Sequence, residues 1–138
     1  YVYENTAAIP RFRFVQKVVA KINEAEVLSA IGEMSVDQLL KTLLVDETAA
    51  QRMGGIKDNY VLGRIELMNY SADKIVLDVE VDGDALLVVA NSYSKFWKAR
   101  IDGVETPIVP AYATFWGVAV PSGAKRVVFS YEPLYAIF

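Results

Sequence analysis

Histidine and cysteine are both absent from the 138 residues of this chain. Without cysteine there are no disulfide bonds and no thiolate chemistry. Without histidine the chain lacks the commonest general base and the commonest metal ligand, and its serines cannot form a Ser-His-Asp triad. Gly54-Gly55 is not followed by the lysine and hydroxyl residue of a phosphate-binding loop. We therefore expect the isolated domain not to be an enzyme, with no catalytic residue and no cofactor.

Long apolar runs and clustered positive charge are also absent. No stretch reaches the roughly 18 apolar residues of a membrane helix, and no signal peptide is recognisable. The net charge is -3 and the pI about 5.0, so nucleic acid is not an expected partner. With 54% hydrophobic and 22% charged residues, residues 1–138 are expected to form a single domain with its own core. The start at Tyr1 without methionine and the apolar segment 134–138 predict an ectodomain excised from a larger membrane protein.

Residues 1–59 are predicted to be a mixed part of helix, strand and loop. Alternation of phenylalanine and arginine predicts a strand from Arg11 as far as Gln16. Asn23 and the acidic residues after it predict a helix over 24–31, ended by Gly32. Ser35-Val36-Asp37-Gln38 has capping-box spacing and predicts a second short helix or turn. Residues 41–46 either continue that helix or form a strand, and 47–59 are predicted to be a loop.

Residues 60–138 are predicted to form the β-sandwich core. Strands are expected over 60–70 and 75–81, and residues 86–90 are apolar at every position, which predicts a central strand covered on both sides. Asp82-Gly83 and Asp102-Gly103 are hairpin signals, whereas Pro107 and Pro110 indicate an edge or bulged strand. The spacing of strands and turns predicts a mainly β fold. We expect an antiparallel β-sandwich of about seven or eight strands, with one or two short N-terminal helices.

Several short motifs from Leu86 onward resemble one protein family. They are Leu86-Leu87-Val88-Val89, Ser92-Tyr93, Trp97-Lys98-Ala99, Ile101-Asp102-Gly103, Thr106-Pro107-Ile108, Gly117-Val118-Ala119-Val120-Pro121-Ser122-Gly123, Val127, Phe129 and Tyr131-Glu132-Pro133. Upstream, Ile9-Pro10-Arg11 and Asn69-Tyr70-Ser71 also fit. In this order the chain resembles the C-terminal extracytoplasmic domain of the YfhO-like bacterial membrane protein family. It departs from that pattern at Lys95-Phe96, where the family has Pro-Gly, and at Trp116, where the family often has a basic residue.

The resemblance implies a function that the residues alone do not. Members of this family are polytopic and related to membrane glycosyltransferases that modify cell-envelope polymers. It therefore implies a non-catalytic domain on the extracytoplasmic side of the bacterial cell membrane, beside a membrane-embedded region that carries the chemistry. The domain would contact envelope glycan or lipid-linked sugar, or pack on that membrane region, and the full-length protein is a possible glycosyltransferase. The alternatives are a free-standing carbohydrate-binding module and a protein-interaction domain without a small ligand.

Aromatic residues are the best candidates for ligand binding, because exposed rings stack on the apolar faces of sugars. The candidate set consists of five aromatic and two basic residues: Tyr93, Phe96, Tyr112, Phe115, Trp116, Lys98 and Arg100. Phe96 and Phe115 have the outward parity of their strands and are the stronger ligand candidates. Trp97 and Trp116 share parity with aliphatic neighbours, which favours the core for both. We expect Trp97 to be buried, with a cost of about 3–5 kcal/mol for truncation to alanine.

Four acidic residues alternate along one strand and the turn after it. Asp78, Glu80, Asp82 and Asp84 could be considered for a calcium site or for the carboxylate pair of a glycoside hydrolase. Their spacing fits no dedicated calcium loop, and nothing places two of them across a cleft. We therefore expect a solvated strand face, with no metal site.

Overall fold

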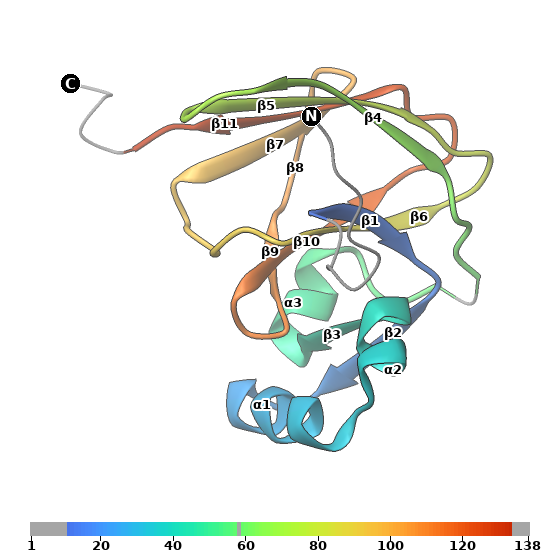
Figure 1. The fold of residues 1–138 in the computed structure, drawn as a ribbon, viewed down its shortest axis with the longest axis vertical. Coiled ribbons are helices and arrows are strands. Elements are labelled where there is room, and N and C mark those ends of the chain that lie inside the picture. The colour runs from blue at the N-terminus through green and yellow to red at the C-terminus, as the bar shows by residue number, and fades with distance from the viewer. Residues whose placement is uncertain (1–10, 58, 134–138) are drawn as a thin grey trace.

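The protein is built in three layers, as the computed structural model shows for the residues that it describes, 11–57 and 59–133 (Figure 1). A five-stranded sheet forms the first layer and a four-stranded sheet the second. A two-stranded sheet with short helices forms the third layer, beneath the four-stranded sheet in Figure 1.

The two larger sheets are antiparallel throughout and form a sandwich. The five-stranded sheet has the order β4 (Arg64–Tyr70), β5 (Lys74–Glu80), β11 (Arg126–Tyr131), β7 (Trp97–Ile101) and β8 (Val104–Thr106). The four-stranded sheet has the order β1 (Phe12–Val15), β6 (Ala85–Val89), β10 (Phe115–Val120) and β9 (Val109–Ala111). The predicted mainly β, antiparallel sandwich is therefore confirmed. One of its strands, β1, comes from the N-terminal part.

The third layer comes from the N-terminal part of the chain. Its parallel pair is β2 (Lys17–Lys21) with β3 (Thr42–Asp46). Its helices are α1 (Glu24–Glu33), α2 (Val36–Lys41) and α3 (Glu47–Arg52). Of the two alternatives for residues 41–46, the strand is thus the one that forms, as β3. The strand expected from Arg11 to Gln16 forms as β1, and the residues after it form a separate strand, β2.

Each face of the four-stranded sheet supports a separate hydrophobic core. Leu87 and Val89 of β6 face the five-stranded sheet and pack with Phe129. Leu86 and Val88 face the third layer and pack with Leu44. Because β6 is covered on both faces, all of its residues are buried, as its unbroken apolar sequence predicted.

The helix ends follow local capping chemistry. Asn23 accepts a hydrogen bond from the N–H of Glu26, and Ser35 and Gln38 form the predicted capping box. The predicted end of the first helix at Gly32 was wrong, since α1 continues to Glu33 and its C-cap is Met34. The loop expected over 47–59 was also partly wrong. The Asp46 side chain caps α3 by accepting a hydrogen bond from the N–H of Ala49. This cap is difficult to predict from the sequence, because Asp46 is also the last residue of β3.

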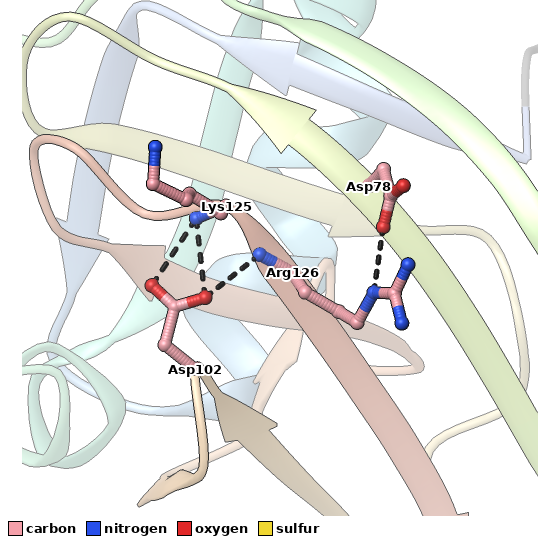
Figure 2. A network of polar contacts seen from close by, with 4 residues as sticks. All are labelled: Asp78, Asp102, Lys125 and Arg126. Atoms are coloured by element: carbon pink, nitrogen blue, oxygen red, sulfur yellow. Dashed lines mark hydrogen bonds and ion pairs between the residues drawn. The ribbon is translucent and has the colours of Figure 1, made fainter.

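The two predicted hairpin signals have different outcomes. Asp102-Gly103 joins β7 to β8 in a true hairpin, with φ values of 50° and 88°. Figure 2 shows the Asp102 carboxylate accepting hydrogen bonds from the N–H groups of Lys125 and Arg126. Asp82-Gly83 does not form a hairpin, because β5 and β6 belong to different sheets and the turn carries the chain across the core. The strand expected over 60–70 begins only at Arg64.

Candidate functional site

A cleft opens where the chain leaves the five-stranded sheet for the four-stranded sheet. The register of β7 with β8 ends at Ala99 opposite Thr106, and Pro107 follows. A proline has no N–H to continue the ladder, so Trp97 and Lys98 of β7 have no β8 residue opposite them. The cleft has a volume of about 500 Å³ and is lined by Arg52, Tyr93, Lys95, Trp97, Lys98, Glu105, Thr106, Pro107 and Ile108.

Positive charge predominates in this basic cleft. Arg52, Lys95 and Lys98 line it against the single carboxylate of Glu105. In the described part of the chain, none of these three cations forms an ion pair. Arg52 donates a hydrogen bond of 3.3 Å to the carbonyl of Ile108, which orients it at the cleft wall. A cleft with this charge balance attracts anions.

Aromatic rings form the other part of the cleft lining. Trp97 is half-buried, so the expectation of full burial was only partly met. Its ring lies 5.1 Å from that of Trp116 and 5.6 Å from that of Tyr131. Tyr93 is half-buried too, and its N–H donates to the carbonyl of Thr114 at 2.6 Å, which ties the loop around Tyr93 to the loop before β10. The same cleft is therefore lined both by aromatic rings and by basic side chains.

The structure brings together only some of the predicted ligand residues. Tyr93 and Lys98 line the basic cleft, whereas Phe96 is half-buried with its ring 6.3 Å from that of Tyr131. Trp116 is 1% exposed and donates its Nε1–H to the carbonyl of Ser92, so its ring is not accessible at the surface. A ligand role for these residues stays a prediction.

Phe115 and Tyr112 lie on the other side of the loop before β10. Phe115 is half-buried and lines a second, apolar groove with Ile31, Val36, Leu39 and Leu40. Tyr112 is buried, adopts a φ of 55°, and accepts a hydrogen bond of 2.9 Å from Arg13. Its hydroxyl also lies within hydrogen-bonding distance of the carbonyls of Leu39 and Thr42 at the end of α2. Burial raises the pKa of the Tyr112 hydroxyl, so this group stays protonated and holds α2 against the loop.

Arg100 is committed to a polar network on the outer face of the five-stranded sheet. It donates to the Glu132 carboxylate at 2.8 Å and to the Ser130 hydroxyl at 3.2 Å. The hydrogen bond from Arg100, followed by that from Ser130, lowers the pKa of Glu132. The network keeps Glu132 ionised, which suits a structural contact and not a general acid.

Three of the four acidic residues in and after β5 each form an ion pair with a different cation. Asp78 pairs with Arg126 at 2.7 Å, and Asp84 with Lys57 at 3.0 Å. Hydrogen bonds from these cations lower the pKa values of both carboxyl groups. Glu80 faces Arg64 at 3.6 Å. Over residues 11–57 and 59–133, no three acidic side chains gather in a group that could hold a metal ion.

Sequence reasoning missed three charged residues that line the basic cleft. Arg52 lies at the end of α3, which was expected to be a loop, and Glu105 lies on β8. Lys95 stands out in the sequence only as a departure from a family pattern. Lys95 could have been predicted as a site residue, because it lies among aromatic residues in the sequence. Arg52 could not, because no local pattern links it to a loop more than forty residues away.

Comparison with known proteins adds a family to this description. The model of the family described as bacterial membrane protein YfhO matches residues 50–138, which include α3 after its first turn and every strand from β4 to β11. Searches of curated proteins and of solved structures gave no match. Within the described residues, no helix has both the length and the apolar character to cross a membrane. Because the match spans more than half of the sequence, the chain belongs to the YfhO family of bacterial membrane proteins.

Proposed function

We propose that this chain is a non-catalytic extracytoplasmic domain of a polytopic bacterial membrane protein related to envelope glycosyltransferases. In this role its basic cleft binds an envelope glycan or a lipid-linked sugar. Membership in a bacterial membrane protein family supports the membrane setting. The choice of ligand is supported by the aromatic rings of the cleft together with its three cations, none of which forms an ion pair with a described residue.

The observation that carries the proposal is the lining of the cleft. Tyr93 and Trp97 offer aromatic surface to a sugar ring, while Lys95 and Lys98 offer charge to a phosphate or carboxylate. A volume of about 500 Å³ lies within the range of small-molecule sites. The cleft therefore suits a saccharide that carries a negative charge.

A titration of the 138-residue chain with small saccharides tests this proposal. A sugar 1-phosphate and a uronic acid are compared with the neutral parent sugar by calorimetry or NMR. We expect the charged sugars to bind more tightly, and binding to weaken as salt screens the lysines. Lys95→Ala and Lys98→Ala should each weaken binding of the charged sugars by about tenfold, which is close to the lower end of the range for a hydrogen bond to a charged group.

The matched control is Lys125→Ala, which removes an exposed lysine whose side chain points away from the Asp102 network in Figure 2. Its binding should equal that of the unaltered chain. If no saccharide binds at millimolar concentration, or if all three lysine variants bind alike, the cleft is not a saccharide site.

A second candidate role is packing against the membrane-embedded region of the same protein. The apolar groove of about 250 Å³ beside Phe115 favours it, and Val36 at its rim is 66% exposed. A photo-crosslinking residue at position 36 of the membrane-embedded full-length protein should then form an internal crosslink. The same residue at position 125 serves as the control, and equal labelling at both positions would contradict the packing role.

A further inference from the structure

Strand β4 forms a long edge of the five-stranded sheet. Among the described residues it pairs only with β5, and it is seven residues long, whereas β8 at the opposite edge has three. Leu62, Leu67 and Met68 on or beside this edge are each about half exposed, at 57%, 48% and 49%. The sequence from Leu62 to Tyr70 contains neither the proline nor the lysine that commonly protects an edge strand. As far as Leu67, after which the register of β4 shifts, this edge is therefore open to pairing with another strand.

Backbone direction determines which residues can make that pairing. Val79 of β5 donates its N–H to the carbonyl of Lys125, so its backbone groups point toward β11 and away from β4. Neighbouring residues of a strand direct their N–H and C=O groups to opposite edges, so Asp78 and Glu80 face β4. Their partners Glu66 and Arg64 face back toward β5. Ile65 and Leu67 consequently direct their backbone groups to the open edge, up to the register shift that follows Leu67.

The charges next to Ile65 are self-complementary. If two copies of β4 pair antiparallel about a two-fold axis at Ile65, Arg64 of each copy lies opposite Glu66 of the other. Moving the axis by one residue places Arg64 opposite Arg64 or Glu66 opposite Glu66, which is unfavourable. Arg64 already contacts Glu80 at 3.6 Å, but both side chains are largely exposed and this ion pair contributes little. Only the register centred on Ile65 therefore combines edge-facing backbone with opposite charges.

We propose that β4 is a dimerisation edge, on which a second copy of this chain adds its own β4 antiparallel in the register centred on Ile65. The five-stranded sheets of the two copies continue into each other, and the exposed side chains of Leu62 and Leu67 become covered at the junction. The symmetry is that of an isologous contact, in which the same strand serves both partners.

Charge reversal tests both the contact and its register. Light scattering after size-exclusion chromatography, over a wide range of protein concentration, should show a concentration-dependent dimer of the 138-residue chain. Arg64→Glu and Glu66→Arg each set like charges against each other twice and should weaken the dimer by about tenfold or more. The double variant exchanges the two charges and should restore the dimer. Glu33→Arg, a charge reversal on α1, should leave it unchanged.

Thermal unfolding of each variant shows whether it is folded, and the double variant guards against a loss of dimer caused by misfolding alone. A chain that is monomeric at every concentration would overturn the proposal. So would a dimer that both single reversals leave intact, or one that the double exchange fails to restore in a folded protein.

Discussion

The indole rings of Trp97 and Trp116 lie 5.1 Å apart and connect the basic cleft to the core of the sandwich. Trp116 is 1% exposed, and its ring is also 5.1 Å from that of Phe129. Trp97 is half-buried, packs on Trp116 from one side and lines the cleft from the other. The cleft lining is therefore supported by the core, which limits its freedom to rearrange.

The two tryptophans should differ in their contribution to stability. Trp116→Ala should lower the free energy of unfolding by about 3–5 kcal/mol, the range for a buried aromatic side chain. Trp97→Ala should cost clearly less, because part of its ring is already in contact with water. Urea denaturation followed by circular dichroism measures both. An equal or larger loss for Trp97 would contradict this ranking.

The turn after β7 provides a second test of stability. Gly103 has a φ of 88°, and no atom lies within 4 Å of the position that a Cβ would occupy there, so Gly103→Ala meets backbone strain and no steric clash. We expect a loss of about 1–2 kcal/mol in the free energy of unfolding. Gly32→Ala is the matched control, since Gly32 lies in α1 with equal space around it. Alanine favours helix there, so this variant should be as stable as the parent or up to about 1 kcal/mol more stable.

Local features of the fold could be predicted from the sequence because their causes are local. The apolar run of β6, the capping box of Ser35 with Gln38 and the Asp102-Gly103 hairpin each depend on neighbouring residues. The outcome at Asp82-Gly83 depends on which sheet the next strand joins, and this is decided by packing across the core. The same dipeptide signal therefore gave one correct and one wrong prediction.

The candidate site was less predictable than the fold. Tyr93 and Lys98 could be named from their sequence context, but Arg52 and Glu105 reach the cleft from other elements. Tyr112, in the turn before β10, and Trp116, on β10 itself, were named from the same aromatic context and are buried instead. Parity along a strand separates the two faces of a sheet, but it does not show which loop residues stay in contact with solvent.

Chemistry gives a third prediction. Purified chain should neither hydrolyse a glycoside nor transfer sugar from an activated donor. Glu132 and Asp78 are held ionised by Arg100 and Arg126, so neither can donate a proton to a leaving group near neutral pH. Reproducible turnover that is lost in Glu132→Gln or in a substitution of Glu105 would contradict a non-catalytic role.

The last prediction concerns the dependence of stability on pH. Cationic partners lower the pKa values of Asp78, Asp84 and Glu132 from ordinary values of 3.8, 3.8 and 4.5. Above these ordinary values the three groups are ionised in both folded and unfolded chain, and their contribution to stability is fully present. As the pH falls below about 4.5, the unfolded chain takes up protons before the folded chain does, and the contribution is progressively lost. With no histidine to titrate, stability should stay level between about pH 6 and 8.

Thermal unfolding across this pH range, at low and high salt, measures the effect. The three ion pairs are at the surface, so added salt should flatten the decline on the acidic side. Glu132→Gln removes one of the three groups and should make the decline shallower. Glu33→Gln is the matched control, because Glu33 is exposed on α1 and the described residues give it no ion pair. A decline that is unaffected by Glu132→Gln, or one that begins near neutral pH, would show that other groups determine the acid stability of this domain.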